Sequence, residues 1–472
     1  MPELSFLLEA AYEDSDVSAC QVYTRSREIR REKAIDRISR REFFAGGLKL
    51  AGLAGFRSLG LRRLRGPEVL RLDRKPQDRP SPGPSAPAGR RAGFFAVQTH
   101  FGQFRPDVDE LLDLVDDAGS SWIRDEVYWS QVEKRKGVFD FPPEYDDYLA
   151  AAQDRGIHVL LILDFGNPLY SAAEKTGPAS EAEREAFARY CAQVVRRYGP
   201  YGVRHFEIWN EPNASTFWKP QPNPENYARL LETAYRSCKD VDPDSVVLGC
   251  STAGTDIEFI RRVLAAGGGR FMDAVSFHPY CQPAAPEDRL LADISRLKAL
   301  VPEKPLWITE FGYPSYAGAS GVNEEVQANY LVRAFLLAAS SPAVERMFWY
   351  DLQNDGEDPA EGEFNFGLVR MDKTLKPSYR AFATMASLVG QFPPAQLRSI
   401  GDTHILTFEG QESPLAAVWR SGGTDVLGLP CSNGLYRVVG GDGESSSIEV
   451  YEEVLQLTVS EKPVFVIREG RA

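Results

Sequence analysis

Two glutamates, Glu211 and Glu310, are the residues of this sequence whose surroundings point most directly to chemistry. Glu211 follows a short run of aromatic and β-branched residues, the composition of a buried strand, and Pro212 ends that run. Glu310 ends a second apolar run, 306–309, and a glycine-containing loop follows it. Two carboxylates at strand ends can divide acid/base and nucleophilic work between them, which is what cleavage of a glycosidic bond needs.

The elements that would position these glutamates alternate regularly from about residue 92 onward. Short apolar runs alternate with amphipathic segments, several of which begin at Pro, Asp or Ser as helices do. The expected strands are 94–99, 121–124, 158–163, 205–209, 246–249, 274–277, 306–309 and 346–350. The expected helices include 108–118, 144–155, 181–198, 224–241, 257–266, 289–300 and 323–339. Eight such repeats predict an α/β fold, the (β/α)8 TIM barrel, and no G-x-G-x-x-G motif follows the first strand to favour a doubly wound sheet.

Residues at the C-terminal ends of barrel strands form the candidate site, because chemistry is done there in such barrels. Besides the two glutamates they are His100, Arg124, Trp129, Asn210, His278, Tyr280 and Trp349. This mixture suits a sugar, because carboxylates and amides bind hydroxyls while tryptophan faces cover the apolar side of a pyranose ring. A phosphate substrate would call for a glycine-rich loop with Lys or Arg near the last strands, and the sequence lacks one.

The sequence around both glutamates resembles the retaining glycoside hydrolases of clan A. The resemblance rests on Trp209-Asn210-Glu211-Pro212 at the fourth strand and Thr309-Glu310-Phe311-Gly312-Tyr313 at the seventh. The wider context is most like family 39, whose relatives include β-xylosidases, α-L-iduronidases and exopolysaccharide-cleaving endoglycosidases. That context consists of Trp129 with Glu133 and Gly137, Phe277-His278-Pro279-Tyr280, and Phe348-Trp349-Tyr350. The match covers about residues 94–390 and implies a glycosidase acting on a carbohydrate.

The resemblance also implies roles for individual residues. Glu211 would be the general acid/base, and Glu310 would be the nucleophile that forms a glycosyl-enzyme intermediate. Asn210 would bind the sugar 2-hydroxyl, and Trp349 would form the floor of the subsite for the reacting sugar. The remaining substrate contacts would come from Arg124, His278, Tyr280, Trp129 and His100.

Several alternatives stay open at the level of sequence. Arg124 would help to keep Glu310 ionised, although it could instead pair with its neighbours Asp125 or Glu126. Trp349 could belong to barrel packing. A catalytically silent glycan-binding barrel and a transglycosylase are the alternative functions, and the presence of both glutamates favours an enzyme. The sugar, its linkage, endo or exo action and the oligomeric state cannot be read from the sequence.

Charge separates the N-terminal segment from the rest of this chain of 472 residues. The whole chain carries −13, whereas residues 21–91 carry a net +12, which leaves −25 for the remainder. So acidic a body argues against nucleic acid as a partner of the whole molecule. We expect a leader over 1–91, the barrel over 92–390 and a β-sandwich-like accessory module over 391–472. The module has short alternating runs, and we expect strands from elsewhere in the chain to join them.

The leader contains Arg40-Arg41 followed by a glycine-rich, weakly apolar run over 45–56. This resembles a twin-arginine export signal, and the run is too short for a stable membrane anchor. A linker rich in Pro, Ser and Gly follows over 76–89. We therefore expect export to the periplasm or the medium; a leader without function would leave the protein in the cytoplasm.

Cysteine spacing argues against a metal centre. None of the six cysteines forms a C-x-x-C pair, and His278 with Cys281 lacks the further ligands that a metal needs. We therefore expect no metal and no cofactor, and thiols that are buried as small apolar groups.

Overall fold

The computed structural model describes residues 93–390, 392–409 and 415–469. The expected leader over 1–91, with its twin-arginine motif and linker, lies outside the described residues. Within them, no helix combines the length and the apolar character needed to cross a membrane.

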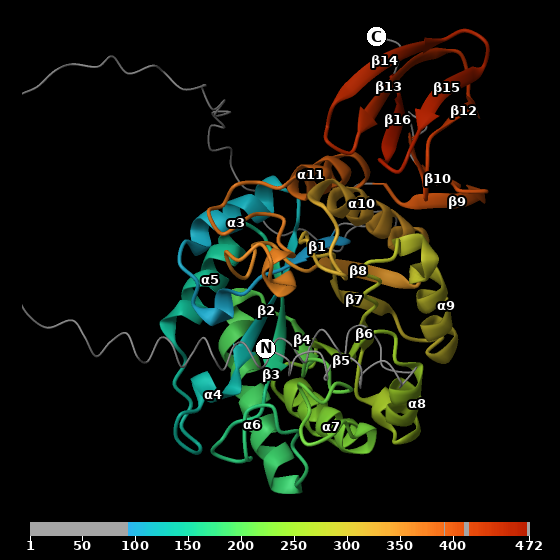
Figure 1. Cartoon of the computed structure of the whole chain (residues 1–472). Helices are drawn as coiled ribbons and strands as arrows, with labels where there is room; N and C mark the ends of the chain where they lie inside the picture. Colours follow the sequence, from blue (N-terminus) through green and yellow to red (C-terminus); the bar gives the residue numbers. More distant parts are fainter. Residues whose placement is uncertain (1–92, 391, 410–414, 470–472) are drawn as a thin grey trace, which may run out of the picture. The chain divides into compact units, whose positions relative to one another are not determined.

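A closed barrel of eight parallel strands, in the order of the sequence, forms the body of the chain, as predicted (Figure 1). Its strands are β1 (Phe95–Gln98), β2 (Trp122–Tyr128), β3 (His158–Asp164), β4 (His205–Ile208), β5 (Val246–Ala253), β6 (Ala274–His278), β7 (Leu306–Phe311) and β8 (Val344–Trp349). The barrel closes where β1 pairs with β8, for example Val97 with Trp349. The strands are buried almost throughout, as the near-continuous apolar runs of a parallel sheet require.

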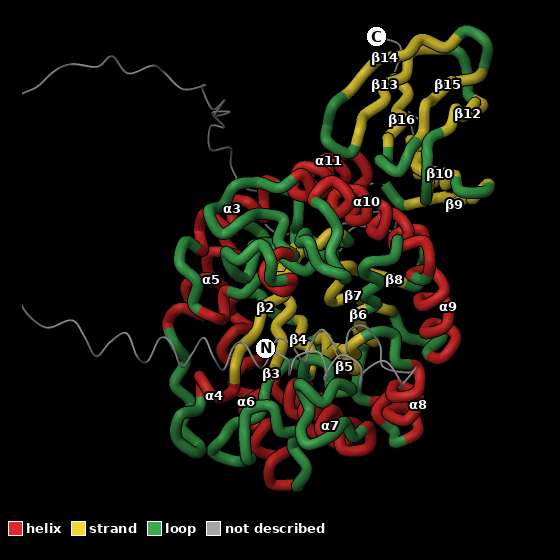
Figure 2. The backbone as a smooth tube through the Cα atoms, viewed as in Figure 1, coloured by secondary structure: helices red, strands yellow, loops and turns green. Residues whose placement is uncertain are grey.

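Helices follow the strands and surround them (Figure 2). They are α3 (Val108–Asp117), α4 (Trp129–Val132), α5 (Pro143–Asp154), α6 (Glu181–Tyr198), α7 (Pro224–Val241), α8 (Ile257–Ala265), α9 (Leu290–Leu300), α10 (Glu324–Ser340) and α11 (Pro377–Val389). Their starts follow local capping chemistry. Ser180 accepts from the Glu183 backbone while Glu183 reaches back to it, a capping box that begins α6. Asn223 and Asn323 cap α7 and α10 in the same side-chain-to-backbone manner.

The second strand is longer than the sequence suggested. The expected strand ended at residue 124, whereas β2 continues to Tyr128, with Asp125 and Glu126 in its interior. Asp125 can stay in the strand because its carboxylate accepts backbone N–H groups from Phe101 and Gly102. Arg124 therefore lies inside the barrel wall rather than at a strand end.

The C-terminal module is all-β, as expected. Its strands are β9 (Pro394–Ile400), β10 (Thr403–Phe408), β11 (Leu415–Arg420), β12 (Asp425–Pro430), β13 (Gly434–Gly440), β14 (Ser445–Val450), β15 (Val454–Val459) and β16 (Val464–Arg468). They form a six-stranded antiparallel sheet in the order β14-β13-β16-β11-β10-β9 and a two-stranded sheet of β12 and β15. The expectation of strands from elsewhere was wrong for the described residues, because both sheets draw only on β9–β16. These strands close their own core, around Val418, Tyr436 and Leu457.

The described cysteines carry free thiols, as expected. Four are buried and Cys431 is partly exposed. Burial raises the pKa of the Cys250 thiol to about 12, so this group stays protonated and behaves as a small apolar residue.

Candidate active site

The chain turns sharply after β4, and this turn presents Glu211. Both Trp209 and Glu211 take left-handed backbone conformations, with φ of 70° and 48°. Such conformations cost energy in residues other than glycine and cluster at functional sites. Two contacts hold the turn: the Glu211 amide donates to the Ser251 carbonyl at 2.9 Å, and the Trp209 indole donates to the Phe217 carbonyl at 3.0 Å.

Glu310 lies near the end of β7 and is held from two sides. Arg124 donates a terminal N–H to its Oε1 at 2.6 Å. The Tyr280 hydroxyl donates to its Oε2 at 3.1 Å. Burial, and then the negative charge of Glu310, raise the pKa of Tyr280 well above its usual value, so the phenol remains a donor.

Glu211 and Glu310 are brought together by His278, the last residue of β6. Nδ1 of His278 lies 3.1 Å from Oε1 of Glu211 and 3.6 Å from Oε2 of Glu310. One ring nitrogen of His278 and one carboxylate oxygen from each glutamate all lie within 4.8 Å of one another. Both carboxylates are largely buried, with 4% of Glu211 and 7% of Glu310 exposed. The two strand ends that the sequence singled out therefore meet at one point.

Arg124 connects this pair to the interior of the barrel. Its Nε donates to Oε2 of Glu207 at 2.7 Å, and its terminal nitrogens donate to Gln98 at 2.8 Å and Asn210 at 2.9 Å. Burial lowers the pKa of Arg124, but Glu207 and Glu310 outweigh that effect and the net pKa is raised. Arg124 is therefore a permanent cation beside Glu310.

The predicted alternative for Arg124, an ion pair with Asp125 or Glu126, does not form. Asp125 points to the other face of β2, where its carboxylate binds Thr99 at 2.6 Å. Glu126 faces His100 at 3.3 Å. The structure thus gathers four of the predicted site residues around the two glutamates: Arg124, Asn210, His278 and Tyr280. It adds Gln98, which was not predicted and which accepts a hydrogen bond from Arg124.

Two predicted tryptophans lie in packing instead. Trp129 is 1% exposed, stacks on Tyr170 and Tyr190, and donates its indole N–H to Glu133 at 2.6 Å. Trp349 has no exposed surface, and its indole donates to the Phe366 carbonyl at 3.3 Å. Because both rings are buried, their positions do not support the expected contact with a sugar. For Trp349 they favour the alternative that its ring packs inside the barrel.

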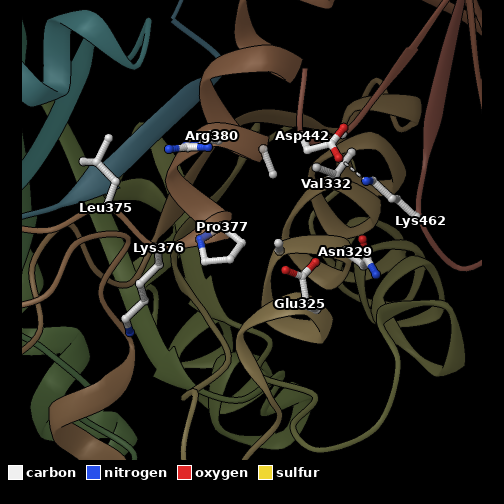
Figure 3. Close-up of a pocket in the computed structure, with 12 residues that line it drawn as sticks. Glu325, Asn329, Val332, Leu375, Lys376, Pro377, Arg380, Asp442 and Lys462 are labelled. Carbon is white, nitrogen blue, oxygen red and sulfur yellow. Dashed lines mark hydrogen bonds and ion pairs between the residues drawn. The ribbon is translucent and has the colours of Figure 1, made fainter. Parts of the chain in front are cut away.

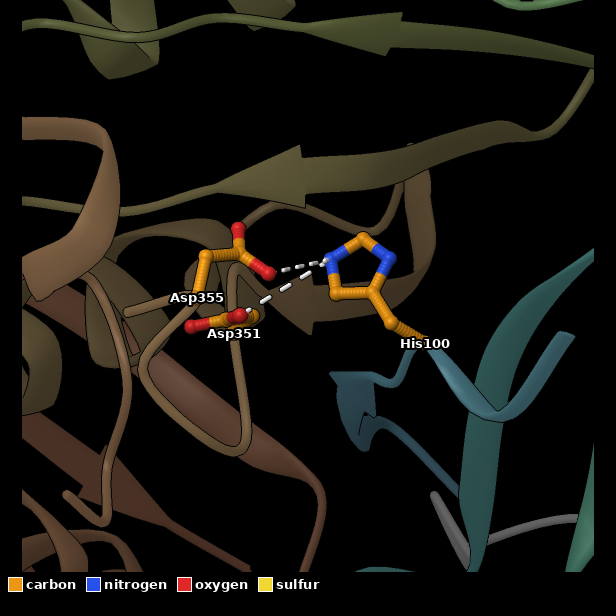
Figure 4. A group of neighbouring side chains, drawn as sticks. All are labelled: His100, Asp351 and Asp355. Carbon is orange, nitrogen blue, oxygen red and sulfur yellow. Dashed lines mark ion pairs between the residues drawn. The ribbon is translucent and has the colours of Figure 1, made fainter. Parts of the chain in front are cut away.

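His100 belongs to a second polar cluster, at the ends of β1 and β8 (Figure 4). Its Nε2 lies 3.7 Å from Asp351 and 3.8 Å from Asp355, and its Nδ1 lies 3.3 Å from Glu126. Burial lowers the pKa of His100, but Asp355 and Glu126 more than compensate and raise it to about 9. Arg105 also pairs with Asp355. The cluster therefore contains both basic and acidic side chains, which pair with one another. That the protein binds no metal remains a prediction.

Glu207 was missed in the sequence, although a signal for it was present. It lies four residues before Glu211 within an apolar strand, where a charge needs a buried partner. The structure supplies Arg124, and both residues have no exposed surface. Which arginine would serve could not be read from the sequence, because 83 positions separate the two.

A cavity of about 220 Å³ lies elsewhere, along α10, α11 and part of the module (Figure 3). Its charged lining includes Glu325, Arg380 and an ion pair of Asp442 with Lys462. No aromatic residue lines it, and none of the predicted site residues does. It therefore lacks the features that made the strand ends a candidate sugar site.

Comparison with known sequences agrees with the geometry of the barrel. The family model of the cellulases, glycosyl hydrolase family 5, matches residues 85–350, which is more than half of the chain. A β-xylosidase of Geobacillus stearothermophilus is 29% identical over 234 residues, 43% of this chain. The chain spans 46% of the length of that relative.

Solved structures extend the similarity to most of the chain. A family 39 glycoside hydrolase of Bacteroides cellulosilyticus has a TM-score of 0.72 and 27% identity, covering 80% of this chain and 81% of that one. A monomeric β-xylosidase of Caulobacter crescentus has a TM-score of 0.63 over 82% of this chain and 98% of its own, but at 19% identity it shows the fold alone. The chain therefore belongs to the glycoside hydrolases of clan A, the clan of the matched cellulase family. Within that clan it is most like family 39.

Proposed function

We propose that the protein is a retaining glycosidase that cleaves a β-linked glycan by double displacement between Glu211 and Glu310. The observation that carries this proposal is the distance between the two carboxylates, whose nearest pair of oxygens is no more than 4.8 Å apart. Retaining enzymes hold their carboxyl groups about 5 to 5.5 Å apart, whereas inverting enzymes need about 6.5 to 9.5 Å to admit a water molecule.

In the first step, an oxygen of Glu310 attacks the anomeric carbon while the bond from that carbon to the leaving oxygen breaks. The leaving oxygen takes its proton from Glu211, so an alcohol departs and a glycosyl ester remains on Glu310. Arg124 and Tyr280 hold the two oxygens of Glu310, at 2.6 and 3.1 Å, and keep the carboxylate aimed at the ring.

In the second step, a water molecule gives one proton to Glu211 and its oxygen attacks the anomeric carbon. The ester bond to Glu310 breaks, and the sugar is released with its original configuration. An acceptor alcohol in place of water would give transglycosylation by the same route. Nδ1 of His278 lies 3.1 Å from Oε1 of Glu211, so the ring can hydrogen-bond that carboxyl group.

Asn210 is oriented for the sugar 2-hydroxyl. Its Oδ1 accepts from Arg124 at 2.9 Å, which turns the amide nitrogen away from that guanidinium. Among the described residues this nitrogen has no hydrogen-bond acceptor, so its N–H groups are available to a substrate oxygen. Hydrogen bonds to this hydroxyl strengthen as charge develops on the sugar.

The proposal is tested by the stereochemistry of the first product. Proton NMR of the anomeric signal should show the β anomer of the released sugar before mutarotation, and an α anomer would contradict retention. Because the β-xylosidase relative suggests where to begin, aryl β-xylosides should lead a panel of aryl glycosides and polysaccharides.

Two variants assign the glutamates. With azide present, Glu211→Ala should yield a β-glycosyl azide and Glu310→Ala an α-glycosyl azide, because azide then replaces water in one case and the nucleophile in the other. The alternative, a silent glycan-binding barrel, predicts binding without any product from the unmodified protein.

We also propose export: lysines in place of Arg40 and Arg41 should leave the protein in the cytoplasm of the producing cell.

A further inference from the structure

Arg124 serves two carboxylates with one guanidinium group. On one side its Nε and a terminal nitrogen lie 2.7 and 2.6 Å from the same oxygen of Glu207. On the other side a terminal N–H donates to Glu310 at 2.6 Å. The donors that remain go to Gln98 and Asn210, so the guanidinium is fully engaged and has one possible orientation.

Glu207 supplies more of that orientation than any other partner. It accepts the hydrogen bond of Nε, the guanidinium nitrogen that is bonded to the aliphatic part of the side chain. This contact fixes the plane in which the other two nitrogens lie. Asn210 and Glu310 receive their hydrogen bonds from the nitrogens so placed. A residue that touches neither the sugar nor the reacting oxygen thus controls two groups that would.

Glu207 also divides the charge of Arg124. Arg124 and Glu207 have no exposed surface, so their interaction is screened little by solvent. Because Glu207 already neutralises much of the guanidinium charge, Glu310 experiences a weaker positive field than an unshared arginine would impose. A carboxylate held less tightly is the better nucleophile and the poorer leaving group.

We infer that Glu207 is a positioning residue of this enzyme, which aims Arg124 at Glu310 and Asn210 and moderates its charge so that Glu310 stays reactive enough to attack. The inference rests on the proposed double displacement, because it concerns the balance between the two steps. The inference predicts opposite effects on the two rates. If Arg124 binds Glu310 more strongly, the glycosyl-enzyme should form more slowly and be hydrolysed faster.

Two substitutions separate charge from reach. Glu207→Gln keeps an acceptor oxygen for Arg124 but removes the charge, whereas Glu207→Asp keeps the charge and shortens the side chain. Glu133→Gln is the matched control, because Glu133 is another buried, hydrogen-bonded glutamate, but it contacts Trp129, Gly137 and Tyr170 instead of Arg124. Thermal unfolding establishes that each variant is folded before its kinetics are compared.

The two steps can be measured separately with an activated aryl glycoside that carries fluorine in place of the 2-hydroxyl, in the sugar that the screen selects. The rate of inactivation reports attack by Glu310, and the rate of recovery reports hydrolysis of the glycosyl-enzyme. In Glu207→Gln we expect inactivation to slow by about tenfold or more while recovery is unchanged or faster. The Glu133→Gln control should leave both rates as in the wild type.

Three outcomes would overturn the inference. Equal slowing of both steps in Glu207→Gln would indicate a purely structural role, and unchanged rates would indicate no role. A Glu207→Asp variant that mimics Glu207→Gln in both steps would exclude the charge effect. Failure of the proposed function has a different appearance: the wild type would cleave no glycan in the screen, or Glu310→Ala would remain fully active.

Discussion

Nδ1 of His278 lies 3.1 Å from Oε1 of Glu211, and the opposite nitrogen of the ring lies 3.1 Å from the Thr309 hydroxyl and 3.3 Å from the Ser251 hydroxyl. Either hydroxyl can donate to Nε2, which leaves the proton of a neutral imidazole on Nδ1, directed at Glu211. The ring, which has no exposed surface, is thus fixed in place by two strands and serves the carboxyl group proposed as the acid/base.

Replacing His278 should therefore impair proton transfer more than sugar attack. In His278→Gln we expect kcat/KM to fall by about 100-fold for aryl glycosides with poor leaving groups. The loss should be much smaller for activated leaving groups, which depart without help from an acid. Steady-state kinetics with the two classes of substrate check this, and equal losses would contradict the assignment. His158→Gln, on the exposed first residue of β3, is the control.

Arg124 should be required for folding as well as for reaction. Arg124→Met would leave Glu207 and Glu310 without their shared cation, which typically costs about 3–5 kcal/mol in the free energy of unfolding. Arg124→Lys keeps a charge but cannot reach all of the acceptors, so we expect a smaller loss of stability together with a large loss of activity.

Urea unfolding and kinetics of both variants test this prediction. Arg261→Lys is the matched control, because Arg261 pairs with Glu258 on the surface of α8, where such pairs contribute about 1 kcal/mol or less. A stability of Arg124→Met equal to that of the control would contradict the importance of the buried pair.

The sequence was sufficient to place both glutamates because each lies in a strand-and-loop motif, and counting strands assigned them to β4 and β7. It was insufficient for Arg124. The continuation of β2 through Asp125 depends on backbone donors of Phe101 and Gly102, which lie more than 20 positions earlier in the chain. A strand that ends at Arg124 and one that continues past it look alike until those donors are known.

Trp129 and β9 show two other features that are hard to predict from sequence. Trp129 follows β2 as a sugar-binding tryptophan would, but Tyr170 and Tyr190 cover its ring, and neither partner is close in sequence. The strand β9 begins at Pro394, and proline is unfavourable inside strands. It is tolerated here because β9 is the edge of its sheet.

The packing of Trp129 makes a prediction that separates stability from binding. Trp129→Ala should cost about 3–5 kcal/mol in the free energy of unfolding, the usual range for a buried tryptophan. Trp129→Phe should cost less and remain well folded. In that variant KM should stay at the wild-type value if the ring only packs, whereas a clear rise in KM would restore the predicted contact with substrate.

The His100 cluster predicts a pH dependence of stability. Folding raises the pKa of His100 from 6.5 to about 9, with Asp355 and Glu126 overcoming the opposing effect of burial. Asp351, Tyr350 and Arg105 also face this ring or its partners.

Because the folded state keeps the proton that the unfolded chain releases above pH 6.5, the stabilisation is complete below that pH and is lost as the pH rises through 9. Urea unfolding of the wild type and His100→Gln at about pH 6 and about pH 10 measures it. Contributions from groups that do not contact His100 are common to both proteins and cancel in the difference between them. We expect the wild type to exceed the variant in stability by more at the lower pH. A difference that is the same at both values would mean that His100 does not gain its proton on folding.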